Sequence, residues 1–386
     1  MITRLKLTNF TSFSEFGIDF SPKINVIIGE NGTGKTQLLK AAYALCNGAA
    51  IYKGNPNTTK KELTSALTTK LVRLFVPLGE RLGRLRRHGA TEVATLRADF
   101  SSGSMVSASF SSNSKALKVE VDPNYSQDRS EAIFIPTKEV LSLVRGMTDR
   151  AHDQHTVELI FDAGYVDLAR ALIQKRLNDP ETEALHDPRL GSLIPKLTNL
   201  IGGRYRLKNG GFDFQPGKYA EKASPARSKA TVAQAYQDST TVEFATFSEE
   251  HLPAGMTAEG FRKVGMLQRL LSDGTLNPGT SGPLFWDEPE SNLNPKLMKL
   301  LVESLLTLSR NGQQVILATH DYVLLKWFDL LMEKGKGDHV RFHSLYRDSD
   351  NRVIVESVDD YNSIRKSAIS DAFAELYDED VKRALG

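Results

Sequence analysis

Residues Ile24–Thr36 read INVIIGENGTGKT, and this stretch decides how the rest of the chain is interpreted. Its first five residues are mostly apolar and β-favouring, so they predict a buried strand. The run Gly29–Thr36 matches the pattern G-x-x-x-x-G-K-[ST], and Gln37–Cys46 then predicts a helix. A strand that leads through a glycine-rich loop into a helix directs backbone N–H groups and partial positive charge at phosphate oxygens. The stretch therefore predicts a nucleoside triphosphate site rather than a chance glycine-rich turn.

The side chains of this loop have separate expected tasks. Lys35 can reach the β- and γ-phosphates, and the hydroxyl of Thr36 can bind Mg²⁺. ATP and Mg²⁺ are therefore the predicted cofactors. The residues expected to contact the nucleotide are Gly29, Glu30, Asn31, Gly32, Thr33, Gly34, Lys35, Thr36 and Gln37.

Length and composition are those of an ordinary globular protein. The chain has 386 residues, of which 40% are hydrophobic and 25% charged. A formal net charge of +2 gives no sign of a general affinity for nucleic acid. The single cysteine, Cys46, excludes an internal disulfide and a cysteine-rich zinc cluster. No signal peptide and no apolar run of membrane-spanning length is evident, so we expect a cytoplasmic protein with no membrane partner.

A second motif lies near the other end of the chain. Pro283–Trp286 predicts an apolar strand that ends in Asp287 and Glu288. A carboxylate at the carboxyl end of a neighbouring strand can hold the water shell of Mg²⁺, which is the role expected for Asp287. The adjacent Glu288 can polarise an attacking water. Two acids after a strand are common by themselves, and it is their combination with the phosphate loop that indicates an ATPase site.

Strand and helix patterns alternate near both ends of the chain, which is typical of an α/β fold. We predict one discontinuous P-loop NTPase domain with a mixed central sheet, flanking helices and an antiparallel β-subdomain. A helical pattern over residues 138–200 predicts an inserted helical lobe, so that 1–137 and 201–386 form the head. The expected strands include Met1–Phe20 as an antiparallel pair, Val93–Phe100, Val106–Phe110, Leu117–Val121, Ala132–Ile135, Thr241–Phe247, Val315–Ala318, Val340–Tyr346 and Arg352–Val358.

Five further segments carry explicit expectations. Leucine spacing predicts a helix over Lys60–Arg87. Its arginine-rich part, Lys70–Arg87, could follow a DNA backbone or be a solvated helix face. Arg204–Phe214 predicts a hairpin, and Gln215–Asp238 a mobile loop. Ser363–Leu385 predicts an amphipathic helix, which could dock a partner but more commonly packs on its own head. The trio His152, Asp153 and His155 lacks further ligands and is interpreted as helix surface rather than a metal site.

Several motifs together resemble a known family. Trp286–Pro295 reads WDEPESNLNP and resembles the Walker B motif and D-loop of ABC-type ATPases in the SMC, RecF and OLD group, of the AAA_21 type. Thr319–Asp321 is similar to the switch histidine segment of that group. Met256–Lys263 stands where the group carries its signature sequence, and Asn9–Phe13 resembles its N-terminal Asn-Phe turn. The resemblance covers roughly residues 1–47 and 241–335, with the four motifs in the expected order.

The resemblance implies an ABC-type head with a shared site. It assigns catalysis to Glu288 together with His320, which would sense the γ-phosphate. It places Ala258, Glu259 and Gly260 against the ATP of a partner head, in a homodimer or higher homo-oligomer with composite ATP sites. Two departures stand out: Ala258 lacks the serine hydroxyl of the family, and Ile135–Glu139 offers no glutamine where the Q-loop is expected. The resemblance therefore implies slow or partner-dependent hydrolysis, which suits a switch.

Three functions compete on this basis. Too little chain follows His320 for a Toprim nuclease, and no heptad run predicts a coiled-coil arm. The chain therefore resembles the stand-alone ATPase of anti-phage modules such as Septu and PARIS, a sensor or scaffold that controls a separate effector, expected to be a nuclease. A RecF-like repair or recombination ATPase that clamps DNA is the alternative, with DNA as a direct partner. A self-sufficient nuclease is disfavoured because no acidic cluster exists beyond Asp287 and Glu288.

Overall fold

The computed structural model describes residues 1–54, 58–122, 125, 131–149, 156–157, 160–174, 185–221 and 242–385. Its centre is a six-stranded mixed sheet in the order β15-β14-β3-β13-β12-β7. Five strands run parallel, and only β15 is antiparallel to its neighbour β14. This confirms the predicted mixed sheet. Its strands are β3 (Ile24–Gly29), β7 (Ile133–Ile135), β12 (Leu284–Asp287), β13 (Val315–Ala318), β14 (Val340–Arg347) and β15 (Val353–Val358).

A second, antiparallel sheet forms the predicted β-subdomain. Its strand order is β2-β1-β4-β5-β6, so the first two strands of the chain pair with a later three-stranded meander. The sheet's inner face is apolar in strict alternation, as the burial pattern of β4 shows. The strands are β1 (Ile2–Phe10), β2 (Phe13–Asp19), β4 (Ala94–Phe100), β5 (Met105–Phe110) and β6 (Lys118–Val121).

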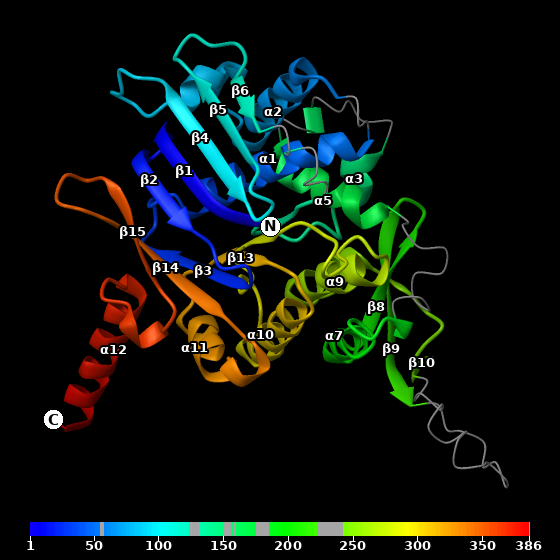
Figure 1. Cartoon of the computed structure of the whole chain (residues 1–386). Coiled ribbons are helices and arrows are strands. Elements are labelled where there is room, and N and C mark those ends of the chain that lie inside the picture. Colours follow the sequence, from blue (N-terminus) through cyan, green and yellow to red (C-terminus); the bar gives the residue numbers. More distant parts are fainter. Residues whose placement is uncertain are drawn as a thin grey trace, which may run out of the picture.

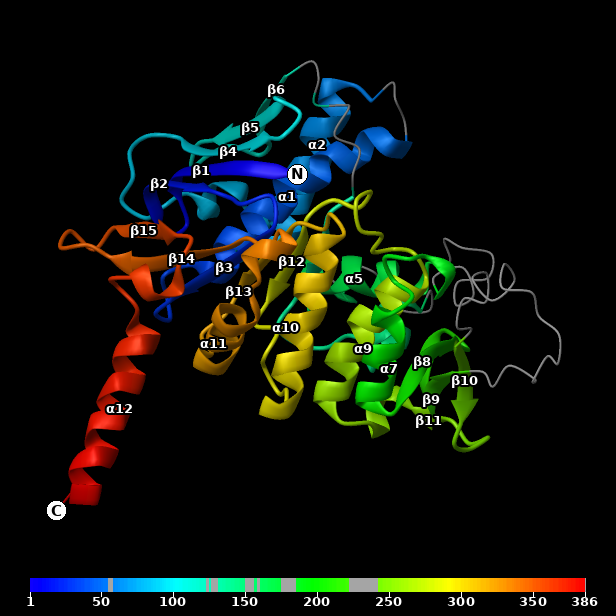
Figure 2. The same cartoon turned by 60° about the horizontal axis from the view of Figure 1, so that its bottom comes forward.

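Helices cover both faces of the central sheet (Figure 1, Figure 2). Helix α1 (Lys35–Gly54) packs between the two sheets, where Ile27 and Ile316 of the central sheet join one hydrophobic cluster. The alternate residues of the same strands, such as Val26 and Leu317, join the cluster on the opposite face. The remaining helices are α2 (Lys60–Phe75), α3 (Val144–Thr148), α5 (Ala163–Ile173), α7 (Leu193–Ile201), α9 (Glu259–Ser272), α10 (Pro295–Arg310), α11 (Tyr322–Leu331) and α12 (Ala368–Leu385).

In the described part of the region predicted as an inserted lobe, the regular elements are helices joined by turns and irregular segments. Helices α3, α5 and α7 lie in it, and side chains such as Leu168 and Leu193 belong to the same hydrophobic cluster as Leu284 of the central sheet. The helices thus share the core of the head, and the boundary at 138–200 stays a prediction. The trio His152, Asp153 and His155 lies outside the described residues.

The predicted hairpin is present, but the loop expected after it is wrong in its first part. Strands β8 (Gly203–Lys208) and β9 (Gly211–Glu221) are joined through Asn209 and Gly210, whose φ angles of 50° and 75° are those of a tight hairpin turn. Strand β9 runs on through 215–221 because β8 pairs with it at 215–216 and β10 (Val242–Thr246) pairs with it at 217–221. The short β11 (Leu252–Pro253) pairs nearer the start of β9. Residues 222–238 of the expected loop lie outside the described residues.

The single helix predicted over Lys60–Arg87 is also wrong. Helix α2 ends at Phe75, and Val76 adopts a left-handed conformation with φ of 42°. Pro77 follows, and a proline in the next turn would remove a backbone donor and clash with the preceding turn. The remaining leucines lie in two short 3₁₀ turns, Leu78–Glu80 and Leu82–Leu85. The leucine spacing therefore continues beyond the end of the helix, which Pro77 already marked in the sequence.

The last helix does not pack along its own head. Helix α12 begins at Ala368, later than expected, and projects from the body of the molecule (Figure 2). Phe373 stacks on Tyr322 of α11 with ring centroids 4.2 Å apart. Further along the helix, the side chains of Leu376 and Tyr377 are 64% and 69% exposed. Across the part of the chain that is described, no helix combines the length and the apolar character that a membrane crossing requires.

Candidate active site

The glycine-rich loop connects the carboxyl end of β3 to the first turn of α1. Gly34 has a φ of +93°, and a Cβ placed on it would lie 2.5 Å from the hydroxyl oxygen of Ser12. Only glycine fits this position, because both the backbone conformation and the close approach exclude a side chain. Ser12 belongs to the turn between β1 and β2 and donates a hydrogen bond of 3.1 Å to the Gln37 side chain. The antiparallel sheet thus fixes the position of the loop.

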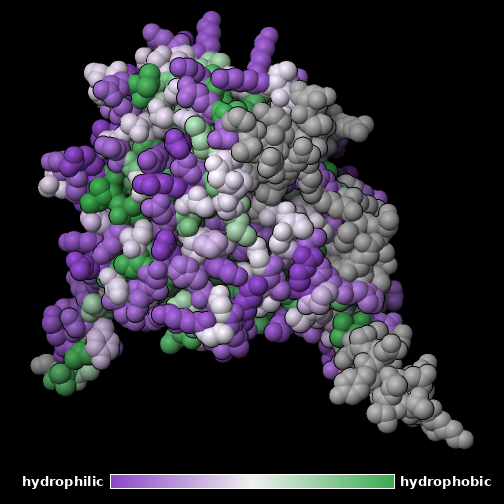
Figure 3. Space-filling view, viewed as in Figure 1, coloured by the Kyte–Doolittle hydropathy of each residue, from purple (hydrophilic) through white to green (hydrophobic). Residues whose placement is uncertain are grey.

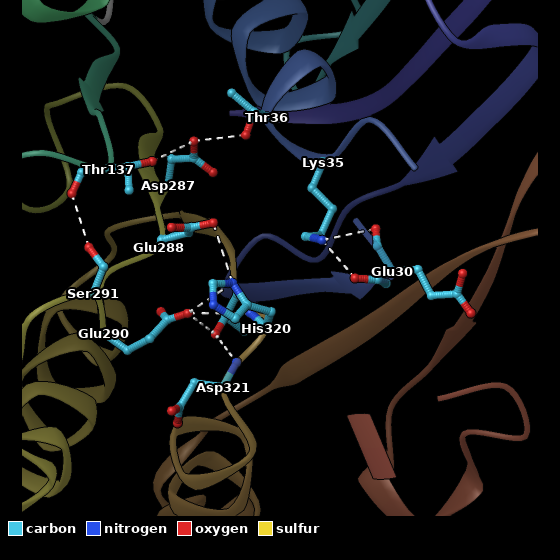
Figure 4. Close-up of polar contacts among 12 residues, drawn as sticks. Glu30, Lys35, Thr36, Thr137, Asp287, Glu288, Glu290, Ser291, His320 and Asp321 are labelled. Carbon is cyan, nitrogen blue, oxygen red and sulfur yellow. Dashed lines mark hydrogen bonds and ion pairs between the residues drawn. The ribbon is translucent and has the colours of Figure 1, made fainter. Parts of the chain in front are cut away.

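Lys35 points back into its own loop. Its ammonium donates hydrogen bonds of 2.6 and 3.2 Å to the carbonyl oxygens of Gly29 and Glu30 (Figure 4). Burial lowers the pKa of Lys35, and the carboxylates of nearby acids, Glu288 foremost, oppose that shift. A cation held among backbone carbonyls can exchange those acceptors for phosphate oxygens, which bind ammonium more strongly.

The rest of the loop is arranged around this lysine. Thr33 donates a hydrogen bond of 2.8 Å to the carbonyl of Glu30, which closes the loop. Asn31 and Gly32 are exposed at its tip, and the guanidinium of Arg347 on β14 donates a bond of 2.9 Å to the Gly32 carbonyl. A strand more than three hundred residues away along the chain therefore supports the tip of the loop.

Asp287 lies at the carboxyl end of β12 and accepts hydrogen bonds from two hydroxyl groups. Thr36 and Thr137 donate bonds of 2.9 and 3.0 Å to the same oxygen, Oδ2. Burial raises the pKa of the Asp287 carboxyl, while the two hydroxyl bonds act in the opposite direction. Thr36 starts α1 and Thr137 follows β7, so three elements converge on this carboxylate (Figure 4).

This donor set fits Mg²⁺. The ion prefers hard oxygen ligands and is usually held by one or two protein oxygens together with water and phosphate oxygens. The Thr36 hydroxyl and the Asp287 carboxylate are such ligands, already in contact with each other. No group of three or more His, Cys, Asp or Glu side chains that could hold a metal is found among the described residues. A magnesium ion at this site would therefore depend on the phosphates of the nucleotide.

Glu288 follows in a strained conformation. Its φ angle is 48°, which is uncommon for a residue with a side chain. Its backbone N–H donates a bond of 2.9 Å to the carbonyl of Ala318 on β13. Its carboxylate lies 3.3 Å from Nδ1 of His320, which follows the end of that same strand. Backbone strain of this kind persists only where neighbours determine it, and it is common at functional sites.

Glu290 anchors the segment that carries His320. Its side chain is 6% exposed and accepts bonds of 2.7 Å from the Thr319 hydroxyl and 3.3 Å from the His320 backbone N–H. Burial raises the pKa of this carboxyl, and the bonds from Thr319 and His320 oppose the rise. The turn after β12 and the end of β13 are thereby held together.

The signature segment lies at the start of α9, against the D-loop of the same chain. Ala258 is the exposed N-cap residue of the helix, and Glu259 accepts a bond of 2.9 Å from the Asn292 side chain. Gly260 is buried, and a Cβ on it would lie 2.8 Å from the Asn292 carbonyl. Glu259 and Gly260 are therefore placed against Asn292, in the segment that follows β12 of the same chain.

The structure brings Lys35, Thr36, Asp287, Glu288 and His320 to one edge of the sheet, as their positions after parallel strands predict. Residues that sequence reasoning did not assign also reach this edge. Thr137 stands where a Q-loop glutamine was expected, so its position was the signal that could have found it. Lys263 and Glu290 lie inside two of the quoted motifs, Met256–Lys263 and Trp286–Pro295, but no role was predicted for them, and no local pattern marks Arg347.

Comparison with known proteins now decides the family. A family model described as an AAA ATPase domain matches residues 1–201, just over half of the chain. The chain belongs to this family. A second model, an AAA domain whose description refers to AbiEii toxins and Type IV TA systems, matches residues 251–326. The two matches of this AAA ATPase include the phosphate loop and the acids after β12 respectively.

Individual relatives cover much less of this AAA ATPase. It is 44% identical over 62 residues to the DNA replication and repair protein RecF of Lysinibacillus sphaericus, and 45% identical over 67 residues to RecF of Idiomarina loihiensis. The alignments span 16% and 17% of this chain and 16% and 19% of those relatives, so the chain matches less than a fifth of their length.

Two solved structures were compared over nearly the whole chain. The SMC head domain from Thermotoga maritima is 14% identical, with a TM-score of 0.47 over 92% of this chain and 98% of that chain. An SMC head bound to the C-winged helix domain of ScpA is 12% identical, with a TM-score of 0.49 over 95% and 99%.

Proposed function

We propose that this AAA ATPase is an ABC-type, SMC/RecF-like enzyme that binds and slowly hydrolyses ATP as a switch. The observation that carries the proposal is the convergence of Thr36 and Asp287 beside Lys35, Glu288 and His320. A phosphate cradle, a magnesium-binding pair and an acid positioned by a histidine are the parts that hydrolysis of a phosphoanhydride requires.

Each residue has one task in this scheme. Lys35 leaves the carbonyls of its loop and binds the β- and γ-phosphates. Thr36 and Asp287 hold Mg²⁺, which when bound neutralises charge that develops on the phosphate oxygens. Glu288 accepts a hydrogen bond from the attacking water and polarises it. His320, whose side chain is 53% exposed, would sense the γ-phosphate from its position beside Glu288.

A composite site follows from the placement of the signature segment. Ala258 is exposed at the N-terminus of α9, and a helix N-terminus attracts anions. A second copy of the chain that presented Ala258, Glu259 and Gly260 to the open side of the phosphate loop would complete the site. Alanine in place of the family's serine removes one hydroxyl donor, which supports slow turnover and a long-lived ATP-bound dimer.

The switch would control a separate effector. Slow hydrolysis suits an ATP-bound assembly that holds or releases a partner, and the projecting α12 gives the chain exposed apolar surface outside the ATP site. Following the resemblance to the ATPases of anti-phage modules, we assign the protein to antiviral defence with a nuclease as the effector.

The experiment compares two variants of the full chain. Glu288→Gln keeps the size of the side chain and removes its charge, so ATP should remain bound while hydrolysis falls by roughly 10²–10⁴-fold. Lys35→Ala should lose ATP itself. ATP retention, phosphate release and co-elution of the products of neighbouring genes are measured for both. Loss of ATP binding in Glu288→Gln would contradict the assigned role, and identical partner behaviour in the two variants would refute the switch.

One observation favours the alternative of a RecF-like DNA clamp, namely the local identity of 44–45% to RecF proteins. In that case the isolated protein should bind duplex DNA only with ATP, and binding should weaken steeply as salt rises. Fluorescence anisotropy with a labelled duplex at two salt concentrations, for wild type and Lys35→Ala, measures this directly. ATP-dependent binding by the protein without any partner would favour the clamp over the effector switch.

A further inference from the structure

A buried lysine connects the signature helix to the catalytic turn. Lys263 of α9 is 1% exposed, and its ammonium donates a bond of 2.7 Å to the backbone carbonyl of Glu288. A second bond goes to the hydroxyl of Ser291. Burial lowers the pKa of Lys263 to about 8, although the nearby carboxylates, with Glu290 first, oppose the shift. Burial of an ammonium is costly, so its retention here calls for a specific role.

The contact falls on the strained residue of the site. The left-handed backbone of Glu288 is held at its N–H by Ala318 of β13 and at its C=O by Lys263 of α9. With both peptide groups held, the direction of the Glu288 side chain is set before nucleotide or water arrives. Without the ammonium, the carbonyl would be free to turn and the backbone could relax toward an unstrained conformation.

The same lysine begins a chain of bonds toward the magnesium-binding pair. The Ser291 hydroxyl donates a bond of 3.1 Å to the carbonyl of Thr137, whose own hydroxyl holds Asp287. Lys263 lies less than one helical turn from Gly260 on α9. A displacement of Gly260 by a partner head would therefore also displace Lys263. Both acids of the ATP site are thus linked to α9, the helix that would face a partner head in the proposed composite site.

We propose that Lys263 is a positioning residue for hydrolysis, which holds the Glu288 backbone in its strained turn and links that turn to the signature helix. The inference rests on the proposed function, because it assumes that Glu288 polarises water. In this role Lys263 acts through the backbone carbonyl of Glu288 rather than on the phosphates or the attacking water.

The test uses Lys263→Met, Lys263→Arg and a matched control. Methionine fills a similar volume without a donor, and arginine keeps a charged donor. Gln268→Met is the control, because Gln268 is also buried on α9 and bonds to Thr198 and the Gly203 carbonyl, away from the catalytic turn. For Lys263→Met we expect kcat to fall roughly 10- to 100-fold, the cost typical of a misplaced catalytic group, with ATP affinity within about twofold of wild type. Lys263→Arg should recover part of the rate.

Amide hydrogen exchange gives a readout that does not depend on hydrolysis. Exchange over residues 287–293 should be faster in Lys263→Met and unchanged in Gln268→Met, which should instead lower the melting temperature. If Lys263→Met keeps the wild-type kcat and exchange while Glu288→Gln stalls, the positioning role is wrong and the proposed function stands. If Glu288→Gln hydrolyses ATP like wild type, the proposed function fails, and unchanged exchange in Lys263→Met would then overturn the positioning role separately.

Discussion

A buried histidine next to the phosphate-loop strand should make the protein sensitive to acid. His343 on β14 lies between Asn25 of β3 and Ser357 of β15, with Nε2 3.2 Å from the Asn25 oxygen and Nδ1 2.8 Å from the Ser357 hydroxyl. The Asn25 oxygen can only accept, so Nε2 carries the proton and Nδ1 accepts from serine. Burial, with a smaller contribution from Arg341, lowers the pKa of His343 to about 3. The experiment lowers the pH from above the ordinary pKa of histidine, about 6.5, toward this lowered pKa.

The sign and size of the effect follow from linkage. The unfolded chain protonates His343 near its ordinary pKa of about 6.5, whereas the folded chain does not until the pH is far lower. The lowered pKa of His343 therefore contributes stability that is fully present at pH values above the unfolded pKa and is lost as the pH falls below it. Between about pH 7 and about pH 5 the loss should reach about 2 kcal/mol, since each pH unit below the unfolded pKa costs about 1.4 kcal/mol.

Urea unfolding followed by tryptophan fluorescence, at about pH 7 and about pH 5, measures this loss. Other groups titrate in the same interval, so the decisive quantity is the difference between wild type and His343→Gln, which cannot take up the proton. The variant should be less stable than wild type near neutral pH and should lose about 2 kcal/mol less on acidification. Equal pH dependence in the two proteins would show that His343 titrates normally and would refute the reasoning.

Two further predictions concern surfaces of the chain. Ala258→Arg places a long cation on the exposed start of α9, so the variant should fold normally and by itself should not hydrolyse ATP. Each mixed dimer formed with Lys35→Ala should regain one of its two sites, as measured by phosphate release; no recovery, with both variants folded and associating, would contradict a shared site. Leu376→Asp should change the free energy of unfolding by less than about 0.5 kcal/mol, because the side chain is 64% exposed; a clear loss of stability by calorimetry would show that α12 is held down in solution.

Much of the site could be predicted from local sequence. The phosphate loop, the strand before it and the helix after it depend on residues within a dozen positions of one another. The acids after β12 and the histidine after β13 could be expected at one edge because the carboxyl ends of parallel strands meet there. The assignment of catalytic and metal-binding roles to Asp287, Glu288 and His320 remains a prediction that the variants above test.

Two wrong predictions, the helix beyond Phe75 and the loop at Gln215, each relied on one local sequence pattern where a second feature acted against it. The leucine spacing after Phe75 suggested a continuing helix, although Pro77 already marked its end. Glycine and proline near Gln215 suggested a loop, although pairing with β8 at Pro216 and with β10 from Gly217 onward extends the strand through them. The helical leucine pattern failed because proline cannot continue a helix, and the loop pattern failed because neighbouring strands pair with β9.

The sequence by itself determined the parts: a glycine-rich loop, alternating strands and helices, and acids at strand ends, because these depend on spacing over a single turn or strand. Tertiary structure alone decided how the parts act together. Thr36 meets Asp287 across 251 positions, and Lys263 reaches Glu288 because α9 packs beside the end of β12. A hydrogen bond requires two groups about 3 Å apart, and for residues remote in sequence only the packing of sheets and helices sets that distance.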